Sequence, residues 1–285
     1  MKNKKIKKDN GLKKRLIISA VIIVFLTVFS FWQNNMLTVS EHIYTTDKIG
    51  SQLDGYTIVH ISDYHNKNFG KGQKRIIDKI SSLEPDIIVI TGDIADSNHT
   101  NIPMAIEFAE GAAKIADTYY VTGNHEHRFN ADDFEKLMNG LEQAGVKRLV
   151  DESVDIEKNG ESFVLTGFDD QSLVDIERNC PKLAADKLNV VLAHEPEYIA
   201  DYSKHGNIDL VLSGHAHGGQ FRLPFIGAVY APDQGFDPEY TEGMHKLGDT
   251  SMIISRGIGN SAFPLRLFNY PEIIKITLKS EKADN

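Results

Sequence analysis

Five short polar motifs occur along the chain, and their residue types suit metal chemistry. They hold carboxylates, imidazoles and one amide, which are oxygen and nitrogen ligands that divalent transition metals accept. Two such ions about 3.5–4 Å apart need a shared anionic bridge, and a carboxylate can give one oxygen to each ion. In chain order the motifs are Asp63-Tyr64-His65, Gly92-Asp93-Ile94-Ala95-Asp96, Gly123-Asn124-His125-Glu126, His194 and Gly214-His215-Ala216-His217. Together they predict a two-metal centre.

Spacing within the motifs supports this interpretation. Asp63 and His65 lie two residues apart and can reach one ion together, and His215 and His217 repeat that spacing. Asn124 offers a neutral carbonyl oxygen, which keeps the negative charge of the centre low enough to admit a phosphate.

Each motif alone is weak evidence. A single histidine such as His194 is more often a structural residue, and Asp93 after a glycine is also typical of a turn or a helix cap. The occurrence of all five motifs in one order is what indicates a metal site, with Asp93 as the bridging carboxylate.

Each motif follows an apolar run that is typical of a buried strand. Because open α/β sheets place their sites at the carboxyl ends of strands, we expect the five motifs to meet at one edge. The runs are Thr57–Ile61, Asp86–Ile90, Tyr119–Val121, Val190–Ala193 and Asp209–Leu212.

Helical and period-two patterns fill the rest of the chain. Helices are expected over Gly72–Leu83, Ile102–Ala116, Asp132–Ala144 and near Gln171–Arg178. Shorter strands occupy 147–166, with a turn at Asn159-Gly160, and further strands are expected at Met36–Tyr44, Ser251–Ser255 and Pro271–Leu278. Parallel βα units followed by antiparallel strands predict one α/β sandwich, in which two sheets lie face to face with helices outside.

The N-terminus differs from the rest of the chain. Residues 1–15 carry a net charge of +7, and 16–32 contain no charged residue. Seventeen residues are at the short end of a bilayer span, and bulky Phe31 and Trp32 stand where a cleaved signal peptide needs small residues. We therefore favour an uncleaved anchor over a cleaved signal. The positive-inside rule then predicts a single-pass cell-membrane protein with a cytoplasmic tail (1–15), an anchor (16–32), a linker with an edge strand (33–54) and an extracytoplasmic domain (55–285).

Charge and cysteine content narrow the function classes. The full chain carries −9, so 16–285 carry −16, which argues against binding of nucleic-acid backbones. Cys180 is the single cysteine, which precludes an intramolecular disulfide, and we interpret it as incidental. The histidines outside the motifs are predicted to be surface or packing residues: His42, His60, His99, His127, His205 and His245.

The motif set Asp-x-His, Gly-Asp-x-x-Asp, Gly-Asn-His-Glu, His and Gly-His-x-His resembles the calcineurin-like metallophosphoesterase superfamily. Three later stretches resemble its membrane-associated bacterial phosphodiesterase branch, similar to UDP-2,3-diacylglucosamine pyrophosphatases. These stretches are 218–224, 255–259 and 264–266. The resemblance implies a four-layer α-β-β-α fold and hydrolysis of a phosphate ester by a hydroxide that bridges two ions.

The resemblance also implies roles for individual residues. One ion would be held by Asp63, His65, Asp93 and His217, and the second by Asp93, Asn124, His194 and His215. His125 would bind no metal and would act on the leaving group or the phosphoryl oxygens, with Asp96 orienting its ring. Protein Ser/Thr phosphatases have an arginine after that aspartate, where this chain has Ser97, so phosphate binding falls to the metals, His125 and Arg256 or Arg222.

The predicted function is therefore that of a phosphodiesterase or pyrophosphatase acting on a lipid-linked or envelope phosphate ester. The alternatives are a broad-specificity exported phosphodiesterase for nucleotides or wall polymers, and a metal-binding protein without turnover. Mn²⁺, Fe²⁺/Fe³⁺ and Zn²⁺ all suit the ligand set. The expected partners are the substrate and, through the N-terminal helix, the membrane, with no nucleic acid and no obligate protein partner.

Overall fold

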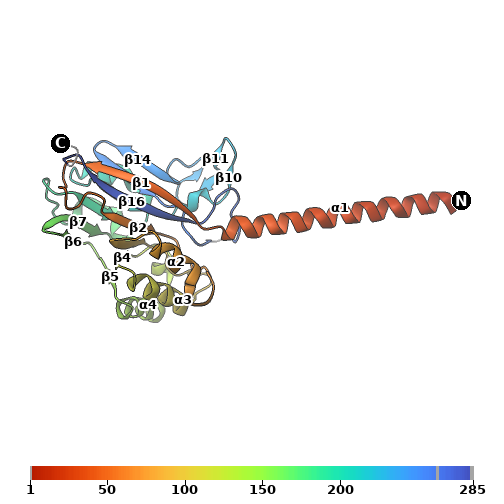
Figure 1. Cartoon of the computed structure of the whole chain (residues 1–285), viewed down its shortest axis with the longest axis horizontal. Helices are drawn as coiled ribbons and strands as arrows, with labels where there is room; N and C mark the ends of the chain where they lie inside the picture. Colours follow the sequence, from red (N-terminus) through yellow and green to blue (C-terminus); the bar gives the residue numbers. More distant parts are fainter. Residues whose placement is uncertain (1, 261–262, 283–285) are drawn as a thin grey trace.

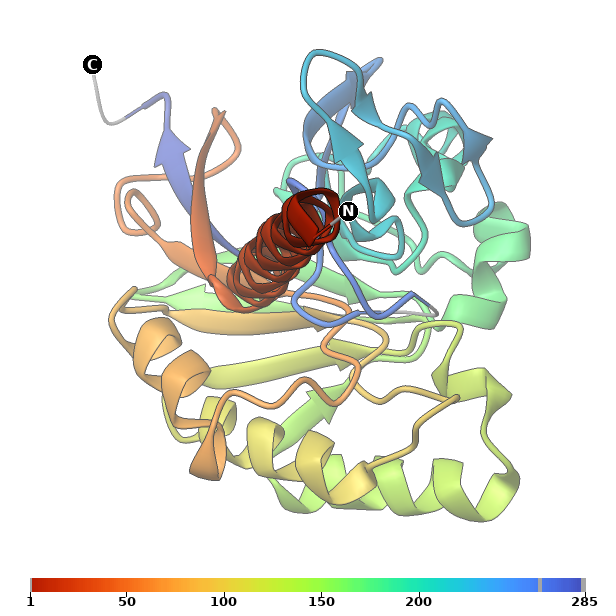
Figure 2. The same cartoon turned by 90° about the vertical axis from the view of Figure 1, so that its right-hand side faces the viewer.

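The computed structural model of the chain describes residues 2–260 and 263–282. Two six-stranded sheets pack face to face, and helices cover their outer faces (Figures 1 and 2). The predicted four-layer sandwich is therefore confirmed.

The first sheet carries three of the five motifs. Its strands lie in the order β1 (Thr38–Thr46), β16 (Glu272–Ser280), β2 (Thr57–Ile61), β3 (Ile87–Thr91), β4 (Asp117–Val121) and β5 (Val146–Arg148). Strands β2 to β5 are parallel, and β16 runs against β2 but parallel to β1, the predicted edge strand. The outer face is covered by α2 (Lys74–Ser81), α3 (Ile102–Ala113) and α4 (Ala131–Gln143) (Figure 2).

Helix starts in this half follow from local side chains. Asn101 accepts a hydrogen bond from the backbone N–H of Met104 and caps α3, whose first turn holds Pro103. Asn130 caps α4 in the same way by accepting from Asp133. The predicted helix at Gly72–Leu83 begins as a short 3₁₀ turn, η1 (Lys71–Gln73), before α2.

The second sheet carries the other two motifs. Its order is β14 (Gly243–Leu247), β15 (Thr250–Ile254), β9 (Leu210–Ser213), β8 (Asn189–Leu192), β7 (Glu161–Gly167) and β6 (Glu152–Lys158). The four inner strands are parallel, and the β6–β7 hairpin turns at Asn159-Gly160, where both residues have positive φ, as predicted. Its helical cover consists of η3 (Asp170–Asp175), α5 (Ile176–Asn179), η4 (Pro196–Tyr198) and α6 (Ile199–Lys204).

The main core lies between the two sheets. Residues such as Ile58, Val89, Val190 and Leu212 are fully buried there. Strands that are covered on both faces read as continuous apolar runs, which is why the motif-bearing strands could be recognised in the sequence.

Two small hairpins stand apart from the sheets: β10 (Arg222–Leu223) with β11 (Gly227–Ala228), and β12 (Tyr230–Ala231) with β13 (Gly235–Phe236). Figure 1 shows β10 and β11 at the end of the domain from which the N-terminal helix leaves.

That helix, α1 (Lys2–Asn35), is continuous and projects away from the domain (Figure 1). Its stretch Gly11–Asn35 is long and apolar enough to cross a membrane, and its residues are exposed from Gly11 to Val28. The helix includes the described part of the predicted tail, 2–15, and the whole predicted anchor. It continues through 33–35, which the sequence analysis placed in the linker.

Candidate metal centre

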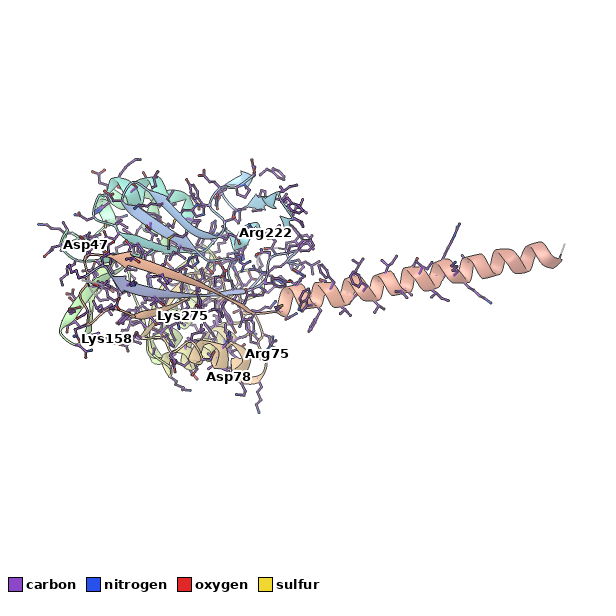
Figure 3. The ribbon with its side chains drawn as sticks, turned by 45° about the horizontal axis from the view of Figure 1, so that its top comes forward. Asp47, Arg75, Asp78, Lys158, Arg222 and Lys275 are labelled. Carbon is purple, nitrogen blue, oxygen red and sulfur yellow. The ribbon has the colours of Figure 1, made fainter. Side chains whose placement is uncertain are left out.

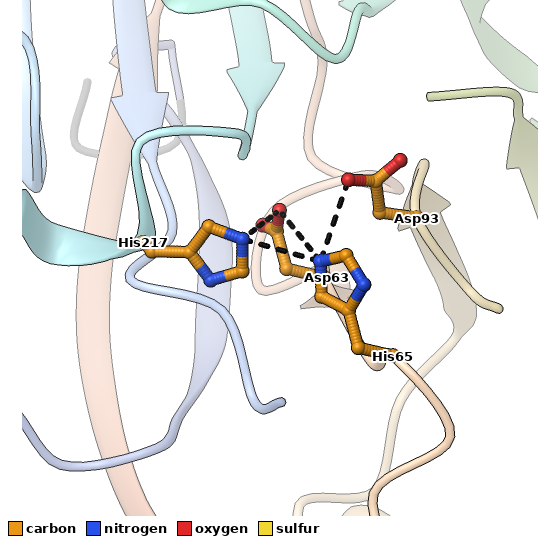
Figure 4. A group of neighbouring side chains, drawn as sticks. All are labelled: Asp63, His65, Asp93 and His217. Atoms are coloured by element: carbon orange, nitrogen blue, oxygen red, sulfur yellow. Dashed lines mark hydrogen bonds and ion pairs between the residues drawn. The ribbon is translucent and has the colours of Figure 1, made fainter. Parts of the chain in front are cut away.

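The five motifs meet at one edge of the sandwich. Those after β2, β3 and β4 come from one sheet, and those after β8 and β9 come from the other. The sheets are joined there by close polar contacts, because His217 Nε2 lies 3.3 Å from Asp63 Oδ1 and the backbone N–H of His215 donates to the same carboxylate. Figure 4 shows four of these side chains pointing toward one another.

The backbone at this edge is strained. Five of the predicted ligands adopt the left-handed conformation, which is uncommon for residues other than glycine and clusters at functional sites. They are Asp63, His65, Asp93, His215 and His217, with φ between 45° and 63°.

Two glycines leave room for these side chains. A Cβ at Gly92, where φ is +81°, would lie 2.5 Å from His194 Nδ1. A Cβ at Gly214 would lie 2.5 Å from Asp63 Oδ2. The glycines of the motifs therefore allow the backbone to approach the ligands closely.

One group of donor atoms converges between the sheets. Ligand atoms of Asp63, His65, Asp93 and His217 all lie within 4.8 Å of one another, and all four residues are buried (Figure 4). Burial lowers the pKa of His65 and of His217, which favours the neutral imidazole that a metal requires. Burial alone would raise the pKa of Asp93, but the nearby His194 and His65 outweigh it and hold that pKa well below its ordinary value.

A second group of predicted ligands approaches Asp93 through the same oxygen, Oδ2, that His65 contacts. His194 Nε2 lies 3.4 Å from Asp93 Oδ2 and 3.2 Å from His215 Nδ1. The side-chain carbonyl oxygen of Asn124, Oδ1, is buried and has no hydrogen-bond partner among the described residues. Because a buried acceptor without a partner is costly, this orphaned oxygen fits the role of a metal ligand.

Outer contacts fix the two imidazoles of the second group. His194 Nδ1 lies 2.8 Å from the Thr91 carbonyl oxygen, and His215 Nε2 lies 2.8 Å from Asp233 Oδ2. These contacts leave the other two nitrogens, His194 Nε2 and His215 Nδ1, to act as ligand atoms 3.2 Å apart, as the hydrogen-bond partners of metal-binding imidazoles commonly do. No sequence motif includes Asp233, which follows Pro232 in the turn between β12 and β13.

Glu126 belongs to the third motif, but no role was predicted for it. It is fully buried, and its carboxylate accepts backbone N–H bonds from Asp93, Ala95 and Gly123 at 2.8–3.2 Å. Burial, and then the charge of Asp93, raises the pKa of Glu126. Glu126 thus joins the loops after β3 and β4.

His125 faces the centre without joining the first ligand group. Its Nε2 lies 4.0 Å from Asp93 Oδ2, and its Nδ1 lies 3.1 Å from Asp96 Oδ1. Ser97 also contacts Nδ1, with its backbone nitrogen at 3.1 Å. Both contacts hold the ring with Nε2 on the side of Asp93.

An arginine that the sequence motifs did not indicate, Arg128, contacts His125. Arg128 Nη1 lies 3.5 Å from His125 Nε2, and among the described residues no carboxylate lies within 4.0 Å of its guanidinium. The candidates that we named, Arg222 and Arg256, both pair with Glu242, and Arg256 also pairs with Glu272. Internal ion pairs therefore occupy those two guanidiniums.

Three residues outside the metal centre were predicted to have no catalytic role: His60, His99 and Cys180. His60 is fully buried and contacts Thr91 Oγ1 at 2.7 Å, so it is a packing residue. His99 is exposed but lies 3.2 Å from Asp96, the carboxylate that orients His125. Burial raises the pKa of the Cys180 thiol to about 12, which agrees with a residue that is not catalytic.

The sequence of the chain matches a known protein family. Residues 56–219, which include all five motifs, match the model of the calcineurin-like phosphoesterases. The chain is 31% identical to the metallophosphoesterase YkuE of Bacillus subtilis (strain 168) over 88% of each chain. It is 28% identical to the phosphodiesterase YaeI of Escherichia coli (strain K12) over 78% of this chain and 82% of that one. It is 26% identical to a transmembrane protein with metallophosphoesterase domain from Danio rerio, over 93% of this chain and 62% of that one.

The likeness to the UDP-2,3-diacylglucosamine branch stays a prediction, because none of these relatives' names carries it. Members of the matched family are two-metal hydrolases of phosphoester bonds, and the described residues contain suitable ligand clusters. This chain belongs to the calcineurin-like metallophosphoesterases.

Proposed function

We propose that the chain is a phosphodiesterase or pyrophosphatase whose substrate carries an apolar chain, as a lipid-linked phosphate ester does. The observation that carries the proposal is an apolar pocket of about 420 Å³ beside the ligand His217. Its walls include Phe221, Tyr230, Phe236 and Phe263, so it offers almost no polar contact to a soluble nucleotide or a wall polymer.

The residues fit two ions. We assign Asp63, His65, Asp93 and His217 to one ion, and Asp93, Asn124, His194 and His215 to the other. When bound, such ions lower the pKa of coordinated water from 15.7 to about 7 and thereby supply a nucleophile at neutral pH.

The chain's own residues supply proton transfer and orientation. His125 directs Nε2 toward the centre, where it can protonate the leaving oxygen, and Asp96 holds the ring through Nδ1. Arg128, next to that Nε2, can pair with a non-bridging phosphoryl oxygen. In this proposal Arg128 supplies the cationic side chain that the position after Asp96, occupied by Ser97, does not.

A series of chromogenic diesters tests the substrate class. The full-length protein, loaded with Mn²⁺, is assayed with p-nitrophenyl alkyl phosphates whose alkyl group is methyl, octyl or hexadecyl, in detergent. Each buried methylene contributes about 0.8 kcal/mol, so kcat/KM should rise steeply with chain length until the pocket is filled.

Equal rates for all three diesters would contradict the apolar pocket and support the broad-specificity alternative. Val229→Trp, which narrows the pocket, should flatten the series while the methyl ester is still hydrolysed. No hydrolysis of any diester would count against phosphodiesterase activity itself.

We also propose that α1 holds the catalytic domain outside the cytoplasm. The charge-free stretch after a +7 tail and the exposure of the helix support this topology. Protease added to intact spheroplasts should remove a C-terminally tagged domain from a full-length membrane protein. A protected domain, or a mature N-terminus near residue 31, would contradict the proposal.

A further inference from the structure

The C-terminal end of α1 packs against the domain and is not a flexible linker. Gln33 donates to the Tyr270 hydroxyl, and Asn34 Oδ1 accepts from the backbone of Arg266 at 2.9 Å. Ring contacts continue along the helix, with Trp32 against Tyr270 and Phe29 against Phe268, the latter at a centroid distance of 5.8 Å. The orientation of α1 therefore fixes the orientation of the domain.

Part of the domain extends along the apolar stretch of the helix. A groove of about 810 Å³ is lined by Ile23 and Leu26 of α1 on one side and by Phe221 and Leu265 of the domain on the other. Ile23 lies nine residues before Trp32, which at 1.5 Å per residue is about 13 Å. With Trp32 at the interface, as is typical of tryptophans in membrane proteins, Phe29 and the domain residue Phe268 that contacts it lie on the hydrocarbon side of Trp32.

The side chains exposed in this region are apolar. We call them the apolar rim: Leu223, Phe225, Ile226, Phe263, Leu265 and Phe268. Phe225 is fully exposed at the tip of the β10–β11 hairpin. The two charged residues within 221–231 and 263–271 are Arg222, which pairs with Glu242, and Arg266, which is buried.

The backbone around the rim also has internal hydrogen-bond partners. The side chain of Gln220 donates to the carbonyl oxygens of Phe263 and Leu265, and Asn260 donates to that of Pro264. Irregular backbone at membrane depth needs such internal partners, because hydrocarbon offers none.

Basic side chains lie where the helix enters the domain. Lys67 Nζ and Arg75 Nη2 donate to the carbonyl oxygens of Asn34 and Asn35. Figure 3 shows Arg75 near the end of the helix that joins the domain. These cations lie about one turn beyond Trp32, where lipid headgroups carry phosphate.

We infer that the apolar rim is inserted into the bilayer leaflet beside α1, as a second membrane contact of the catalytic domain. The inference rests on the proposed membrane location of α1. Exposed apolar patches of this kind mark membrane or protein contacts, and continuity with the apolar helix favours the lipid. The wall residue Phe263 belongs to the rim, so the pocket beside His217 opens at the lipid surface.

Tryptophan fluorescence tests the insertion without any substrate. Trp32 is the single tryptophan of the chain, so Trp32→Phe with Phe225→Trp places one reporter in the rim. In phosphatidylcholine vesicles whose acyl chains are dibrominated, this reporter should lose more than half of its emission relative to unbrominated vesicles. The matched control is Trp32→Phe with Asp47→Trp, at the end of the domain opposite α1, and its emission should not change (Figure 3).

Unquenched emission from Phe225→Trp and from a second reporter, Ile226→Trp, would overturn the inference. Blue-shifted but unquenched emission that depends on protein density would also overturn it and would assign the rim to a second copy of the chain. Because the readout needs no turnover, quenching in an inactive protein would leave the insertion standing while the proposed function failed. Hydrolysis by a protein whose reporter is not quenched would support the proposed function and overturn the insertion.

Discussion

Asp93→Asn should abolish phosphodiester hydrolysis and sharply lower the metal content of a folded protein. Asp93 lies between both groups of candidate ligands, 3.4 Å from His65 and 3.4 Å from His194. An amide carries no charge and bridges two cations poorly, so both ions lose their shared ligand. The asparagine can still accept the backbone N–H of His125, which Asp93 Oδ1 now accepts at 2.9 Å, so the loop should keep its conformation.

Metal analysis and circular dichroism provide the measurement. The parent should hold close to two ions per chain, and the variant should hold markedly fewer with an unchanged spectrum. Asp233→Ala is the matched comparison, because Asp233 only supports His215 from outside. Loss of such a partner typically costs about 10–100-fold in metal affinity or activity, and Asp93→Asn should cost more. Full metal content and full activity in Asp93→Asn would refute the two-metal assignment.

His125→Ala should keep both ions and slow the reaction. A positioned acid contributes about 10²–10⁴-fold, and the loss should depend on the leaving group. Nitrophenolate hardly needs a proton and should be affected least, whereas alkoxide leaving groups should be affected most. Asp96→Asn should give a smaller loss of the same kind, because Asp96 contacts only the far nitrogen of the ring.

Arg128→Ala tests whether Arg128 stabilises phosphoryl charge, a role distinct from the proton transfer assigned to the neighbouring His125. If its guanidinium pairs with a phosphoryl oxygen, the rate should fall by a similar factor for every leaving group, and KM should rise. Arg128→Lys should recover part of the loss. If His125→Ala also lowers all rates equally, His125 stabilises charge and donates no proton. Loss of metal in His125→Ala would instead make it a ligand.

The sequence by itself was enough to predict the strands and to select the candidate ligands. Val89, Val190 and their neighbours on the inner strands are buried on both faces, so their runs are apolar without interruption. Side chains directly after such strands lie at a sheet edge wherever the strands are parallel, and the motifs Asp63-x-His65 and His215-x-His217 could be located for that reason.

Contacts between segments far apart in the chain were decided only by the tertiary structure. Asp233 reaches His215 from a turn with no sequence signal. Arg128 contacts His125, whereas Glu242 pairs with both arginines that the sequence favoured. The docking of Phe29 on Phe268 likewise joins the two ends of the chain. The local sequence pattern indicates which face of a helix or strand is buried. Which side chains from distant segments come into contact depends on how the helices and strands pack, and no local pattern indicates that.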